Sequence, residues 1–114
     1  ASRIGRSTFE KQYRGDLRAS ASGTMLTLRT PVEGSAAYVA VERVRGELDG
    51  RAGTFALQHM GTMARGAEDL TIRVVPDSGT GDLEGLEGRL DIEIVEGEHR
   101  YALEYRIPDD EARR

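Results

Sequence analysis

A glycine-rich pattern that occurs twice constrains the fold of this chain more than any other feature. Residues 46–57 read GELDGRAGTFAL and residues 81–92 read GDLEGLEGRLDI. Both fit G-x-L-x-G-x-x-G-x-Φ-x-Φ, where Φ is apolar, and a weaker copy begins at Gly15. Spaced glycines followed by alternating apolar residues are typical of strand–turn–strand units. The repeat therefore predicts an all-β domain built from similar hairpins.

Alternation of apolar and polar residues continues along most of the chain, and helix signals are almost absent. The expected strands cover residues 8–13, 15–20, 23–29, 35–49, 54–63, 69–75, 89–95 and 100–107. About eight antiparallel strands with short turns favour a single up-and-down barrel, because closure removes exposed strand edges. We expect residues 1–107 to form this β-barrel domain and residues 108–114 to form a charged C-terminal tail.

The segment 35–49 changes its parity midway. Val39 and Val41 share one face, whereas Val44 and Leu48 share the other. A β-bulge near Glu42 would keep both sets inside the barrel. The residues expected to face the interior are Phe55, Leu57, Ile72, Val74, Leu90, Ile92, Leu103 and Val41.

Composition excludes several classes of function. The chain has 114 residues, enough for one domain with its own core. It has no cysteine and only two histidines, which excludes thiol chemistry and a His-rich metal site, and it fits a cytoplasmic location. Arginine and acidic residues alternate within a net charge of −4, which disfavours nucleic acid as a partner. No apolar run approaches the ~18 residues of a membrane span, and no motif indicates a cofactor.

Two segments carry a resemblance to a known family. They are ERVRGELDGRAGTFALQHMGTM, residues 42–63, and VVPDSGTGDL, residues 74–83. With the surrounding sequence from Phe9 to Ile107, they resemble the bacterial family called domain of unknown function 3224. Members of that family look like small barrels of the allene oxide cyclase type, so the resemblance implies this fold but no established reaction.

The resemblance also bears on association. Family members usually begin with a further strand of the form TFEV-x-L-x-P, ahead of the region that matches Arg6, and this chain lacks that pattern. An additional N-terminal segment or a neighbouring subunit would cover the edge left open. We expect a homo-oligomer, most simply a twofold dimer.

His59 is the first candidate for a binding site. It has the same parity as Phe55 and Leu57, so its imidazole is expected to point inward. There it can exchange a hydrogen bond with a ligand in the barrel lumen. The alternative is a core histidine whose hydrogen bonds are purely structural.

Tyr101, Tyr105 and Glu42 complete the candidate ligand-binding set. The two tyrosines share the apolar face of the last strand, where packing alone also explains them. A carboxylate beside an inward face is costly unless it is paired, which makes Glu42 a candidate acid or base. Alternatively, Arg43, Arg45 or Arg73 neutralises this carboxylate at the surface.

Three functions remain open. The first is binding of a small hydrophobic molecule in the lumen, with His59, Tyr101, Tyr105 and Glu42 as polar contacts. The second, which the resemblance implies, is a cyclase or isomerase of the allene oxide cyclase type that acts on a reactive hydrophobic substrate. The third is a filled barrel that acts only through oligomerisation. A cavity beside His59 would favour the first two.

Overall fold

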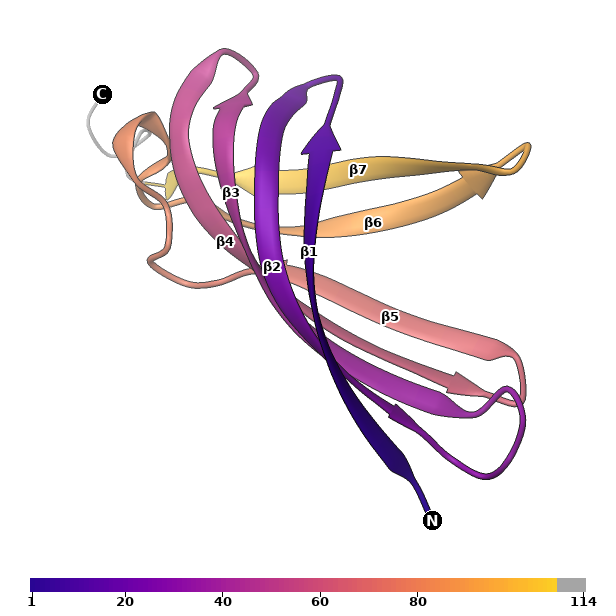
Figure 1. Ribbon diagram of the computed structural model, residues 1–114. Coiled ribbons are helices and arrows are strands. Elements are labelled where there is room, and N and C mark those ends of the chain that lie inside the picture. The colour runs from indigo at the N-terminus through magenta and orange to yellow at the C-terminus, as the bar shows by residue number, and fades with distance from the viewer. Residues whose placement is uncertain (109–114) are drawn as a thin grey trace.

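The computed structural model describes residues 1–108 and, within them, all side chains except those of residues 94, 95, 98 and 99. Seven strands and one 3₁₀ turn follow one another: β1 (Arg3–Tyr13), β2 (Leu17–Arg29), β3 (Ala36–Leu48), β4 (Arg51–Ala64), β5 (Ala67–Val74), η1 (Gly81–Leu83), β6 (Glu87–Val95) and β7 (Glu98–Arg106). Each strand pairs antiparallel with the next, in one sheet of order β1 to β7 (Figure 1). The prediction of an all-β chain is confirmed, and no described helix is long and apolar enough to span a membrane.

The described chain has seven strands instead of the expected eight, because two of the expected segments belong to a single strand. Residues 17–20 of one expected strand and all of the next, 23–29, lie within the continuous strand β2. Gly23 pairs with Phe9 on β1 and with Glu42 on β3, so it belongs to the ladder and not to a turn. A Cβ at this glycine would overlap the ring of Phe9, so the missing side chain leaves space for an aromatic neighbour.

Closure of a barrel is not confirmed. Among the described residues, β1 and β7 do not pair, so the sheet is not closed by hydrogen bonds. The ladder between β5 and β6 consists of a single pair, Arg73 with Arg89. The β6–β7 hairpin consequently diverges from β5 and crosses the curved β1–β5 sheet at a wide angle (Figure 1). Residues 109–114 of the expected tail lie outside the described part.

One face of the sheet carries the core, and we call it the inner face. Val44 on β3 and Leu57 on β4 have no exposed surface, and Leu90 on β6 packs in the same cluster. Complete burial of such a side chain contributes roughly 1.5–3 kcal/mol. The predicted interior residues Phe55, Leu57, Ile72, Val74 and Leu90 are buried, and Ile92 and Leu103 are partly buried against them.

The predicted bulge and the predicted burial of Val41 are wrong. The register of β3 with β2 and with β4 runs without interruption from Ala36 to Leu48. Val39 and Val41 are therefore 49% and 57% exposed on the outer face, opposite the core. The prediction assumed that every valine must be buried, but β3 instead turns Glu42 inward, where partners from other strands stabilise its charge.

The two copies of the glycine pattern do not form two hairpins. The first copy is the β3–β4 hairpin, whereas the second contains η1 and the start of β6. The first copy packs against Thr80, which directly precedes the second copy: Thr54 N donates to Thr80 Oγ1 and Thr80 N donates to Thr54 O. A Cβ at Gly53 would overlap the carbonyl oxygen of Thr80. Here glycine permits a close approach between backbones.

Candidate functional site

A cluster of polar side chains lies buried on the inner face. Glu42 on β3 is 2% exposed and His59 on β4 is 6% exposed, and they are the buried polar or charged residues of the described chain. An isolated carboxylate would be strongly destabilised at such a position. Its charge therefore has to be met by donors from neighbouring strands.

Three donors from two strands meet the carboxylate of Glu42. The hydroxyl of Tyr13 lies 3.0 Å from each carboxylate oxygen. Lys11 Nζ lies 3.0 Å from Oε1, and His59 Nε2 lies 2.5 Å from the same oxygen. Lys11 and Tyr13 reach the carboxylate together, because alternate residues of β1 share a face.

These contacts set the protonation of the cluster. Burial raises the pKa of Glu42, but the hydrogen bonds from His59 and Lys11 outweigh it and hold the pKa below its usual value. Burial, followed by the nearby charge of Glu42, raises the pKa of Tyr13, so its hydroxyl stays protonated and donates. An ionised carboxylate only accepts hydrogen bonds, so Nε2 of His59 carries a proton.

The second ring nitrogen of His59, Nδ1, is unpaired in the described part of the chain. Nδ1 has no hydrogen-bond partner among the described residues, and none of their polar side-chain atoms is both buried and unpaired. Phe9 and Tyr38 flank the imidazole, with ring centroids at 6.5 Å and 6.4 Å. The contact with Glu42 thus orients a ring that two aromatic side chains also contact.

Aromatic rings surround the ammonium group of Lys11. Nζ lies 4.9 Å from the ring centroid of Tyr13, 5.4 Å from that of Phe9 and 5.8 Å from that of Tyr101. The rings of Tyr13 and Tyr101 meet edge to face at 5.4 Å. Such rings attract a cation, and the attraction strengthens when water is partly excluded. The rings therefore help to hold the ammonium group of Lys11 at the position where it contacts the carboxylate of Glu42.

Of the predicted site residues, the structure brings Glu42 and His59 into direct contact and adds Tyr101 through Tyr13. It does not bring in Tyr105, whose hydroxyl donates to Asp49 beyond the end of β3. This contact raises the pKa of Tyr105, chiefly through the hydrogen bond. The suggested arginine partners of Glu42 are wrong, because its cationic partner is a lysine.

Lys11 and Tyr13 are the residues that the sequence prediction missed. The alternation of residues 8–13 does show that they share a face with Phe9. Alternation does not show which residue they contact, because Lys11 and Tyr13 lie 31 and 29 positions before Glu42. Only the register of three strands places them together.

Two hollows open next to the cluster. One, of about 320 Å³, continues along the inner face beyond Tyr38 and is lined by Met25, Gly61, Met63 and Leu70 among others. The other, of about 440 Å³, lies between the β1–β2 turn and β7, and Tyr13, Tyr101 and Tyr105 all line it. On the other side of the cluster the inner face is filled by core residues such as Val44 and Leu57.

The fold and the cluster define a class of protein: a single antiparallel β-sheet whose inner face holds a buried carboxylate–histidine pair. No group of three or more His, Cys, Asp or Glu side chains in the described part is arranged to hold a metal ion. The chain belongs to the family described as protein of unknown function (DUF3224), whose model matches residues 1–105.

A solved structure supports the same assignment. It is a DUF3224 protein of unknown function from Shewanella oneidensis MR-1, 44% identical to this chain, with a TM-score of 0.89. The match covers 93% of this chain and 79% of that one. No functionally curated protein matches the chain. The likeness to allene oxide cyclases is not confirmed by these comparisons and stays a prediction.

Proposed function

We propose that this protein binds a small hydrophobic molecule on its inner face, with Nδ1 of His59 as the polar contact. One observation carries the proposal: the 2.5 Å contact between Nε2 of His59 and Glu42 fixes the ring, while Nδ1 has no hydrogen-bond partner among the described residues. The hollow beyond Tyr38 would take the apolar body of the ligand. Apolar pockets with few, well-placed polar groups are the usual form of small-molecule sites.

The charges of the cluster indicate the kind of ligand. Lys11 neutralises Glu42, so these two side chains attract neither an anion nor a cation strongly. A neutral imidazole with Nε2 protonated offers an acceptor at Nδ1. The favoured ligand is therefore a neutral molecule with an apolar ring or chain and one hydroxyl or N–H donor. Tyr101 reaches the cluster only through the ring of Tyr13, and the hydroxyl of Tyr105 is bonded to Asp49 instead.

The test uses two probes that differ by one hydroxyl, 1-naphthol and naphthalene. The wild type should bind naphthol more tightly, by roughly fivefold for one hydrogen bond of about 1 kcal/mol. His59→Phe keeps an aromatic ring and should abolish the preference. Gln58→Leu changes the neighbouring residue on the outer face and should preserve it. Titrations with equal affinities for both probes in the wild type would reject the role of Nδ1.

A second candidate is an isomerase or cyclase, favoured by the same contact. A histidine oriented by a carboxylate is an arrangement for proton transfer, because the anion stabilises the imidazolium that forms. Here Nδ1 would remove a proton from carbon and return it at another position. Deuterium exchange into 2-tetralone, followed by NMR, tests this role. Exchange should be faster with wild type than with His59→Phe, and a rate equal to that in buffer would reject it.

Core side chains already fill part of the inner face. The third candidate function, action only through oligomerisation, is supported by features that lie outside this site. A cytoplasmic location, expected from the lack of cysteine, stays a prediction.

A further inference from the structure

An apolar patch lies on the outer face of the sheet. Leu26, Val39, Val41 and Met60 form it, and they are 45%, 49%, 57% and 60% exposed. Val39 pairs directly with Leu26 on one side and with Met60 on the other, so these three form a continuous row across β2, β3 and β4. The free face of an antiparallel sheet is normally polar. A contiguous apolar patch there indicates an interaction surface.

Opposite charges flank this row on β5. Thr71 stands opposite Met60 and ends the row at β5, and Arg6 stands opposite Leu26 at its β1 end. Arg73 and Asp69 stand opposite Gln58 and Thr62. Arg73 thus lies in the row next to that of Val39, the row that also contains Val41, and Asp69 lies in the next row on the other side of Val39. Both are exposed, and no described residue forms a salt bridge with either.

We propose that a second copy of this chain packs on the outer patch through a twofold axis. A twofold axis that runs parallel to the row of Leu26, Val39 and Met60, above Val39, places this row over the same row of the second copy. The axis also places the neighbouring row that contains Arg73 over the neighbouring row that contains Asp69, and the reverse. It therefore sets Arg73 of each copy over Asp69 of the other. The resulting contact is isologous, since each copy contributes the same surface. Stacked sheets lie about 10 Å apart, a distance that facing side chains fill.

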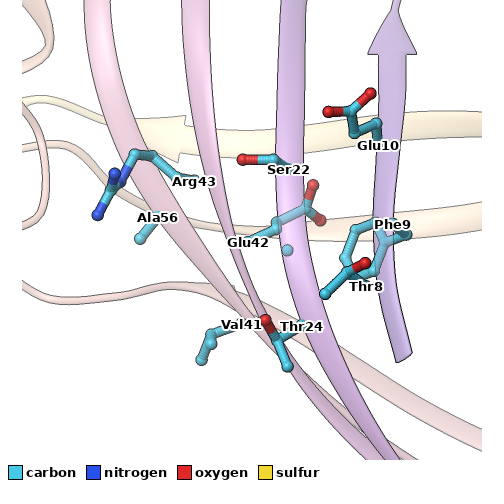
Figure 2. A pocket seen from close by; sticks show the side chains of 10 residues that line it. Thr8, Phe9, Glu10, Ser22, Thr24, Val41, Glu42, Arg43 and Ala56 are labelled. Carbon is cyan, nitrogen blue, oxygen red and sulfur yellow. The ribbon is translucent and has the colours of Figure 1, made fainter. Parts of the chain in front are cut away.

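The shape of the outer face agrees with the same axis. A hollow of about 670 Å³ lies beside the patch and is lined by Thr8, Ser22, Val41 and Arg43 among others (Figure 2). Figure 2 shows Val41 and Arg43 pointing to the opposite side of β3 from the carboxylate of Glu42. The axis exchanges Thr8 with Ile4, whose side chain is 75% exposed. An exposed side chain of each copy thus faces the hollow of the other.

The test is a charge swap measured by sedimentation equilibrium. Arg73→Asp and Asp69→Arg each create two repulsive contacts and should raise the dimer Kd about tenfold or more. The double variant Arg73→Asp/Asp69→Arg should restore the wild-type Kd. Arg18→Asp reverses a charge on the same face far from the patch and should leave the Kd unchanged. Circular dichroism of each variant confirms the fold.

Val39→Lys provides an independent check, because it inserts two charges at the axis and should give a monomer. The proposal is wrong if the wild type sediments as a monomer at about 1 mM. It is also wrong if the wild type is a dimer whose Kd none of these variants changes, because the edge of β1 would then mediate association.

Discussion

His59 contacts Glu42 diagonally across β3 and β4. The residue directly opposite His59 is Ala40, and the residue directly opposite Glu42 is Leu57. Diagonal neighbours on one face lie within reach of long side chains. The small side chain of Ala40 leaves room for the imidazole to lean towards the carboxylate.

Glu42→Gln should lower the free energy of unfolding by roughly 1–3 kcal/mol, the usual loss when buried donors lose a charged acceptor. The amide keeps the volume of the side chain but removes the charge that Lys11 and His59 meet. Glu47→Gln, an exposed position on the same strand, is the matched control and should change little. Urea denaturation measures both. Equal losses in the two variants would contradict the buried cluster.

The same variant should change the response to acid. The pKa of Glu42 is lowered in the fold, so its contribution is complete above the ordinary glutamate value of 4.5 and disappears as pH falls through the folded pKa. The stability gap between wild type and Glu42→Gln should therefore be largest near pH 7 and narrow steadily below pH 4.5. Urea midpoints measured from pH 7 to pH 3 test this. A gap that stays constant with pH would show that the folded carboxyl has its ordinary pKa.

Two valines on β3 offer a matched test of the strand faces. Val44 is fully buried and Val41 is 57% exposed. Val44→Ala should cost about 2 kcal/mol, from two buried methyl groups and the cavity left behind, whereas Val41→Ala should cost less than about 0.5 kcal/mol. Leu57→Ala should cost roughly 2–5 kcal/mol. Thermal and urea unfolding at low protein concentration, where dimers dissociate, give the values. A bulge at Glu42 would make the two valines equivalent.

Two glycines with aromatic neighbours should differ in their tolerance of alanine. A Cβ at Gly23 would meet the ring of Phe9 and lie 2.5 Å from the carbonyl oxygen of Val41, which the ladder holds in place. A Cβ at Gly61 would meet only side chains, those of Tyr38 and Leu70. Gly23→Ala should therefore cost roughly 1–3 kcal/mol, as overpacking does, and Gly61→Ala distinctly less. Urea denaturation of the two variants compares them, and the reverse order would refute the packing described.

Local alternation predicts the all-β fold and the faces of β4. Phe55, Leu57 and His59 point inward because successive side chains of a strand alternate, a property of the backbone that needs no knowledge of other strands. The same alternation identifies His59 as a candidate site residue and places Glu42 on or beside an inward face. The linked motifs of residues 42–63 likewise indicate family membership.

The tertiary structure decided which side chains meet. Lys11 and Tyr13 reach Glu42 through the register of three strands and the curvature of the sheet, neither of which a periodic pattern contains. The bulge was predicted in order to keep the valines on both faces of β3 inside. In the structure the partners of Glu42 stabilise its inward turn, so β3 runs without a bulge and Val39 and Val41 stay outside. A side chain's face depends on its own strand, but its partner depends on the packing of the whole sheet.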